Sequence, residues 1–219
     1  MLTEFQRAWG LAVRAGRPPG RIYRGCALAE RTFLEGLEHS DGFKVTVLVQ
    51  RSWCEHRTRT AARLILAALP EDQGRALVTE WVARGGGTSS FSASEADELL
   101  EFIAQRLPDP SPALTLCRIE QAVHRASLAS ATFAPSDAVA AACDPLLVRA
   151  RGAALVHLEG PLSVLFAPGL ADLHREARGD EIELWLACAS PVRLSAAVSA
   201  GHVREGVMRM IAIGALEAR

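Results

Sequence analysis

The chain has 219 residues, 49% hydrophobic and 22% charged, and its formal net charge at pH 7 is -1. This composition is typical of a globular protein and not of a disordered one, and the near-neutral charge argues against a nucleic-acid-binding surface. The apolar runs are far shorter than the roughly 20 residues of a membrane-spanning helix, so no membrane segment is expected. The first residues, MLTEFQRAWGLAVRAG, lack the continuous apolar core of a signal peptide, which predicts a cytoplasmic location.

The first 140 residues show the periodicity of helices. Apolar residues recur at helical spacing over residues 2–15, 24–38, 50–68, 72–83, 94–107 and 113–130. Breaks are predicted at GRPPGR (16–21), HSDG (39–42), Pro70, RGGGTSSFSAS (84–94) and PDPSP (108–112). The segment FKVTVLV (43–49) alternates and is rich in valine, so it is either a short strand or the extended start of a helix.

The composition changes from Asp144 onward. Three segments, PLLVRA (145–150), AALVHLE (153–159) and PLSVLFA (161–167), predict short strands separated by turns. DEIELWLAC (180–188) alternates apolar and polar residues and is a fourth candidate strand, and SAGHVREGVMRMIAIGALEA (199–218) predicts a C-terminal helix. We therefore predict an α+β chain: a helical bundle over residues 1–140, then a small domain over 141–219 with an antiparallel sheet and a final helix.

The segment ALTLCRIEQAVHRA (113–126) is the first candidate for chemistry. Cys117, Glu120 and His124 share one helix face, which is a possible arrangement of metal ligands. The further ligands of a specific motif such as H-E-x-x-H are missing. The alternative is a packed helix, with Arg118 and Glu120 paired to neighbouring helices and an apolar stripe of Leu116, Ile119, Val123 and Ala126.

Other chemical candidates are weaker. Cys54 lies near His56 and several arginines, which would lower a thiol pKa, but positions 54 and 56 face different sides of a helix. The loop RGGGTSS could present amides to a phosphate, although it lacks the lysine of a Walker motif. The five cysteines form no C-x-x-C pair, so we expect mostly buried free thiols at Cys26, Cys54, Cys117, Cys143 and Cys188. We expect no cofactor or metal in this chain.

The predicted hairpin AALVHLEGPLSVLFA is a candidate binding surface. One of its faces is expected to be buried, through Leu155 or Val156 on one strand and Leu162, Val164 or Phe166 on the other. So small a sheet has edges with unpaired backbone groups, and such an edge can accept an extended peptide by strand addition. The alternative is that the last helix covers the edge.

Two segments carry a resemblance to a known family. GFKVTVLVQRSW (42–53) and LCRIEQAVHRA (116–126), joined by helices with an LPDPSP break, resemble MbnC-type proteins of methanobactin biosynthesis. These proteins are partner subunits of multinuclear iron oxygenases of the DUF692 class. The oxygenase, MbnB, holds the iron ions in a TIM barrel. It converts cysteines of a precursor peptide to oxazolone and thioamide groups, which gives a copper chelator.

The resemblance implies an accessory subunit without catalytic residues. It implies a stable heterodimer with an MbnB-like oxygenase, which holds the iron, and a C-terminal part similar to the peptide-recognition elements that bind a leader peptide. We expect the leader to contact Leu155, His157, Leu162, Val164 and Phe166. We expect the oxygenase to contact Trp53, Arg118, Glu120 and His124. The four tryptophans, Trp9, Trp53, Trp81 and Trp185, are anchors for either an interface or a core.

Two other functions are left open. One is an enzyme that uses Cys117 or Cys54 as a nucleophile, which replacement of each cysteine by serine would test. The other is a DNA-binding regulator, which the near-neutral charge argues against.

Overall fold

The structure is a computed structural model, and it describes residues 6, 8–10, 12–13, 26–86, 93–134, 144–158 and 160–219. Predictions about GRPPGR, Cys143 and the side chain of Ser94 lie outside the described residues. The chain folds as two compact units, residues 1–95 and 96–219. The unit with the sheets thus begins before the predicted domain boundary after residue 140. Helices and small antiparallel sheets together confirm the predicted α+β class.

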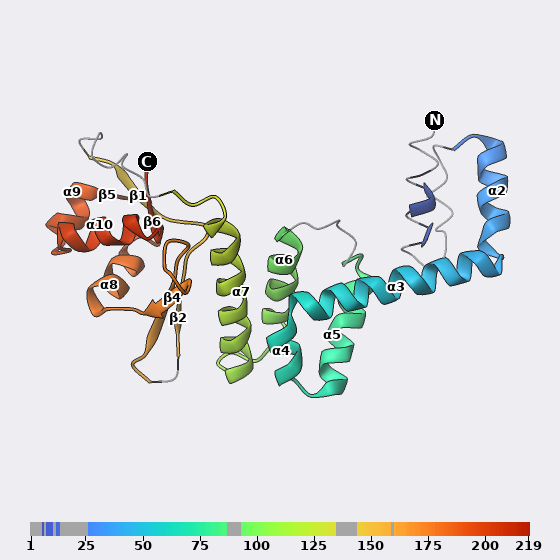
Figure 1. Ribbon diagram of the computed structural model, residues 1–219, viewed down its shortest axis with the longest axis horizontal. Helices are drawn as coiled ribbons and strands as arrows, with labels where there is room; N and C mark the ends of the chain where they lie inside the picture. Colours follow the sequence, from blue (N-terminus) through green and yellow to red (C-terminus); the bar gives the residue numbers. More distant parts are fainter. Residues whose placement is uncertain are drawn as a thin grey trace. The chain divides into compact units, whose positions relative to one another are not determined.

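Helices make up the described part of the first unit (Figure 1). They are α2 (Leu28–Glu38), α3 (Asp41–Ala61), α4 (Arg63–Ala68) and α5 (Glu71–Ala83). The segment 43–49 is part of α3, so the helical alternative is confirmed and the strand is wrong. The Ser40 hydroxyl caps this helix by accepting the Phe43 N–H at 3.1 Å. Phe43 is buried and Val47, one turn later, packs beside it, which is the spacing of a helix face and not of a strand.

The second unit contains two three-stranded antiparallel sheets and five helices in its described part (Figure 1). The helices are α6 (Ala93–Ala104), α7 (Pro112–Ser130), α8 (Gly179–Ala187), α9 (Leu194–Ser199) and α10 (Arg204–Ala212). The strands are β1 (Leu146–Arg149), β2 (Ala154–His157), β3 (Ser163–Phe166), β4 (His174–Glu176), β5 (Val192–Arg193) and β6 (Leu216–Ala218). Their orders are β5-β1-β6 and β2-β3-β4, so the three predicted strands 145–150, 153–159 and 161–167 are confirmed as β1, β2 and β3.

For the second unit, one prediction is wrong and another is confirmed only in part. DEIELWLAC forms helix α8 and not a strand, because Glu181, Leu184, Trp185 and Cys188 are buried at helical spacing whereas Leu186 is exposed. The segment 199–218 contains the predicted C-terminal helix, α10, but is not helical throughout. Helix α10 ends at Ala212, Gly214 just beyond it has a φ of +69°, and Ala215 N–H donates back to the Met210 carbonyl at 2.8 Å. This is a Schellman-type ending, and it releases the chain into strand β6.

The sheet β2-β3-β4 is covered on both faces. Val156 and Phe166 point from one face into a cluster with Ala122 and Ala126 of α7. Leu165 points from the other face into the larger core of the unit, which also contains residues of β1, α8, α10 and β6. The alternation of strand side chains therefore divides this small sheet between two apolar clusters.

Candidate functional site

The outer edge of β2 is the surface that the sequence predicts for peptide binding. Residue pairs along an antiparallel ladder alternate between hydrogen-bonded and non-hydrogen-bonded. Leu158 N–H donates to the Leu162 carbonyl at 2.9 Å, and the β2–β3 register then places Leu155 and His157 in non-hydrogen-bonded pairs. Their N–H and C=O groups point away from β3, and the structure describes no strand beyond β2. This edge can therefore accept another strand.

The predicted peptide-contacting side chains divide between the two faces of the hairpin. Val164 and Phe166 belong to the cluster against α7, and Phe166 is buried there. Leu155 lies on the opposite face, half-buried beside the larger core. Leu162 and His157 are exposed, and His157 Nδ1 lies 2.7 Å from the Ser163 hydroxyl. The structure thus leaves His157 and Leu162 accessible and Phe166 covered, because α7 and not the last helix packs on this face.

Helix α7 approaches the start of β2 very closely. A Cβ atom built at Gly152 would overlap the Ala129 Cβ of α7, so only glycine fits this turn at the present spacing. One turn before Ala129, α7 is joined to α6, because Arg125 forms a bidentate ion pair with Asp97, with one N–O distance of 3.0 Å. One turn earlier still, the buried Gln121 side chain donates to the Asp97 carbonyl at 3.3 Å. The C-terminal half of the helix that covers the hairpin is therefore attached both to α6 and to the turn before β2.

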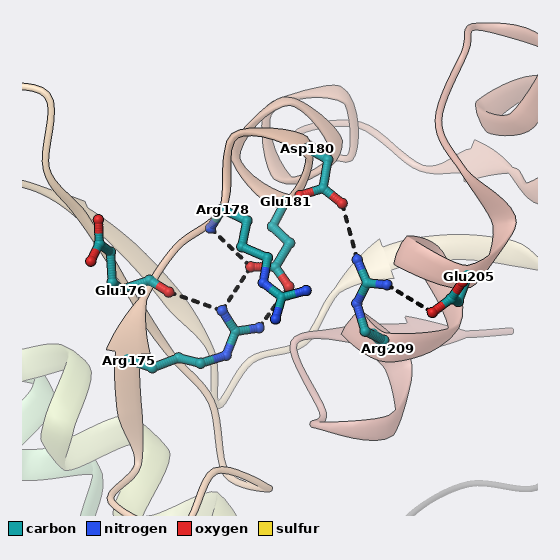
Figure 2. A network of polar contacts seen from close by, with 7 residues as sticks. All are labelled: Arg175, Glu176, Arg178, Asp180, Glu181, Glu205 and Arg209. Carbon is teal, nitrogen blue, oxygen red and sulfur yellow. Dashed lines mark hydrogen bonds and ion pairs between the residues drawn. The ribbon is translucent and has the colours of Figure 1, made fainter.

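The opposite edge of the same sheet, at β4, is tied to helix α8 (Figure 2). Arg175 of β4 donates two hydrogen bonds to the Glu181 carboxylate, at 2.8 and 2.6 Å, and a third to the Glu176 carbonyl at 2.9 Å. The same carboxylate accepts the Arg178 N–H at 3.0 Å, which caps α8. One backbone acceptor of the β4 edge is thus already in use, which leaves the β2 edge more open to a new strand.

Glu181 carries its charge in a buried position, with a side chain only 1% exposed. Burial alone would raise the pKa of this carboxyl, but the hydrogen bonds from Arg175 and from the Arg178 N–H, with the charge of Arg175, hold the pKa below its usual range. The pair therefore stays charged at neutral pH and fixes β4 on α8.

The segment 113–126 forms α7, but its ligand candidates are not assembled. Cys117 is buried and its thiol donates to the Leu100 carbonyl at 3.3 Å, whereas Glu120 and His124 are half-buried and Arg118 is exposed. Among the described residues, no group of three or more His, Cys, Asp or Glu side chains is placed to hold a metal. The predicted apolar stripe is also shifted, since Val123 is exposed and the buried set is Leu114, Cys117, Gln121, Ala122 and Ala126.

Burial makes two of the described cysteines, Cys117 and Cys188, poor nucleophiles. Burial, with the nearby charge of Glu120, raises the pKa of Cys117 to about 12, despite the opposing effect of Arg118. Cys54 is buried and His56 is exposed, so they do not form a pair. Burial raises the pKa of Cys188 as well. Cys26, Cys54, Cys117 and Cys188 form no disulfide among the described residues.

Trp53 lies on an exposed apolar stripe of α3. The stripe consists of Val45, Leu48, Val49 and Trp53, which recur at helical spacing, and Leu48 and Trp53 are 66% and 65% exposed. Large apolar residues gathered on one exposed helix face are typical of a protein–protein contact. The predicted partner residue Trp53 therefore has three apolar neighbours that the sequence analysis did not single out, although their i, i+3, i+4 spacing is visible in VTVLVQRSW.

Comparison of the chain with protein-family models, with curated proteins and with solved structures found no match. Among the described helices, none combines the length and the apolar content that crossing a bilayer requires.

Proposed function

We propose that this chain is a non-catalytic partner subunit of an iron-dependent oxygenase, of the kind that the MbnC-like segments imply. In this proposal the chain binds the leader of a ribosomally made precursor peptide. The oxygenase, which holds the iron, then converts cysteines of that peptide to oxazolone and thioamide groups. The observation that carries the peptide-binding role is the unpaired outer edge of β2, with outward N–H and C=O groups at Leu155 and His157. Holding the leader raises the local concentration of the precursor cysteines at the iron site.

The leader proposal predicts the effect of His157→Pro. Proline removes the outward N–H at this position without breaking the β2–β3 ladder. Loss of one main-chain hydrogen bond, about 1 kcal/mol, should weaken leader binding about fivefold. The measurement is fluorescence anisotropy with a labelled leader peptide, taken from a candidate precursor, that is, a short cysteine-containing peptide encoded in the same genome.

Two variants serve as controls for His157→Pro. His157→Ala removes the imidazole and its contact with Ser163 but keeps the N–H, so leader affinity should stay within twofold of the wild type. His174→Pro removes an outward N–H from the β4 edge and should also leave affinity unchanged. If His174→Pro loses leader binding and His157→Pro keeps it, the leader binds at the β4 edge and not at the β2 edge.

The partner proposal predicts that the α3 stripe docks on the oxygenase. Leu48→Asp places a charge in the middle of this stripe, and Trp53→Ala removes its largest side chain. Central Trp residues commonly contribute 2 kcal/mol or more to an interface, so each change should weaken the heterodimer by about 30-fold or more. The measurement is co-purification of the tagged chain with the co-expressed oxygenase, followed by a binding isotherm.

Leu186→Asp is the matched control for this docking surface, because Leu186 is a similarly exposed leucine on α8. Its oxygenase affinity should equal that of the wild type. An equal loss in Leu186→Asp and Leu48→Asp would mean that the α3 stripe has no special role, and a chain that never co-purifies with the oxygenase would refute the proposed function.

A further inference from the structure

A pocket of about 390 Å³ lies within the second unit, at a place that the proposed leader site does not use. Its walls come from the end of α7 and the turn that follows it (Ala129, Phe133), the turn after β1 (Arg151, Gly152) and strand β6 (Leu216, Ala218). Apolar and polar atoms share the lining about equally, and its charged groups are those of Arg151 and Glu217. This volume is within the range of small-ligand sites and is large enough for one large side chain with its backbone.

The β6 wall of the pocket has unpaired backbone groups. Leu146 and Arg219 exchange two hydrogen bonds of 2.8 and 2.9 Å, and Ala150 N–H donates to the Ala215 carbonyl at 3.1 Å. With the β1–β6 register, this alternation turns the N–H and C=O groups of Leu216 and Ala218 away from β1. No hydrogen bond of these groups to a described residue is found. Leu216 is only 1% exposed, and leaving a buried amide unpaired is unfavourable, so an added strand that reached this amide would be stabilising.

The Phe133 wall of the pocket has a fixed shape. The Phe133 ring packs over two glycines, because a Cβ built at Gly169 would lie 2.6 Å from the ring and one at Gly214 would lie 2.5 Å from it. The backbone beneath the ring is also joined, since Gly169 N–H donates to the Ile213 carbonyl at 2.9 Å. An aromatic wall held in this way forms the pocket without a ligand.

The charges at the pocket are unequal. Glu217 is neutralised by Arg219, whose guanidinium lies 2.8 Å from the carboxylate. Arg151 is exposed and makes no ion pair with any described residue. The pocket therefore presents the uncompensated charge of Arg151 beside apolar side chains. This combination is complementary to a ligand with an apolar group next to a carboxylate.

We propose that this pocket is a second peptide-binding site, which takes an extended segment with an apolar side chain next to an Asp or Glu residue. The segment adds to the outer edge of β6 and satisfies the main-chain groups of Leu216 and Ala218. Its apolar side chain fills the space beside Phe133, and its carboxylate faces Arg151. The site uses a different sheet from the β2 edge, so the inference stands whether or not the proposed function holds.

A displayed library of random ten-residue peptides, selected on the full chain, supplies the probes. Each selected sequence is synthesised with a fluorescein label, and its affinity for variants of the full chain is measured by anisotropy. Ala218→Pro removes an outward N–H and keeps the pairing with β1, so it should weaken one class of peptides about fivefold or more, whereas Ala218→Val should not. Arg151→Glu should weaken the same class, and its members should share an acidic residue beside an apolar one.

His157→Pro separates this inference from the proposed leader site, because it leaves β6 intact. The β6 class should bind His157→Pro within twofold of the wild type. The inference is overturned if no selected peptide is weakened by Ala218→Pro, or if every selected peptide is weakened by His157→Pro instead. The second result would still support the proposed function.

Discussion

Arg175→Met is expected to lower the free energy of unfolding of the second unit by about 3 kcal/mol, the lower end of the range for breaking a buried ion pair. Among the described residues, the variant leaves the buried Glu181 carboxylate with the Arg178 N–H as its one remaining donor. The lower end applies because the Arg175 side chain is 32% exposed. Urea unfolding followed by fluorescence measures the change, since Trp185 is buried in this unit.

Arg209→Met is the control, because it is the same substitution in the same network (Figure 2). Arg209 pairs with Asp180 and Glu205 at 3.0 and 3.2 Å, but these carboxylates are 48% and 80% exposed. Exposed ion pairs contribute about 1 kcal/mol or less, so the loss should be small. If Arg175→Met and Arg209→Met lower the free energy of unfolding equally, the burial of Glu181 does not determine how much its ion pair contributes to stability.

The same pair predicts a dependence on pH. The folded state holds the pKa of Glu181 below its usual range, so the unfolded chain binds the proton more readily. The stabilisation is therefore complete above the unfolded pKa, about 4.3 for a glutamate, and is lost as the pH falls through the lower folded pKa. The stability difference between wild type and Arg175→Met should be largest near neutral pH. It should begin to shrink before the unfolded pKa is reached, because without Arg175 burial raises the pKa of Glu181 in the variant, and it should shrink further as the wild-type carboxylate is protonated in more acidic solution.

Gly214→Ala is expected to lower the free energy of unfolding of the second unit by about 3 kcal/mol. A φ of +69° costs an alanine about 1–2 kcal/mol, and its Cβ would lie 2.9 Å from the Pro168 Cγ and 2.5 Å from the Phe133 ring. Overpacking of this kind costs about 1–3 kcal/mol. The same urea unfolding measures the loss.

Gly160→Ala is the matched control for Gly214→Ala. Gly160 has a similar φ of +82°, but a Cβ built there has no atom within 4 Å. Only the backbone contribution of about 1–2 kcal/mol should remain. If both substitutions cost the same, the Phe133 ring does not pack tightly on Gly214, and the aromatic wall of the β6 pocket is not fixed.

Local sequence patterns predicted the elements for which the pattern of apolar residues and the packing in the structure favour the same secondary structure. The strands β1, β2 and β3 are short apolar runs between Gly and Pro turns, and their type follows from that context alone. In DEIELWLAC the spacing of Ile182 and Leu186 fits a helix as well as an alternating strand. The helix is stabilised by the capping contact of Glu181 with Arg178 and by the burial of Leu184 and Trp185. Neither contribution can be predicted from the segment DEIELWLAC alone.

The candidate site was predictable to a similar extent. A hairpin with an exposed edge follows from AALVHLEGPLSVLFA, and the structure leaves His157 and Leu162 exposed there, although Leu162 was one of the candidates for the buried face. Which backbone groups face outward depends on the register, and the burial of Phe166 depends on α7, which lies some forty residues earlier in the chain. Strand β6 pairs with β1, which lies about seventy residues earlier in the sequence, so no local sequence pattern predicts this strand.

Glu181 holds the first turn of α8 and the strand β4 with one carboxylate group. Detachment of either element alone is costly, because fraying of the helix start withdraws the acceptor of Arg175, and departure of the strand leaves the carboxylate uncompensated. We therefore expect the edge strand of the small sheet and the start of the helix behind it to open together, which native-state hydrogen exchange of their amides would measure.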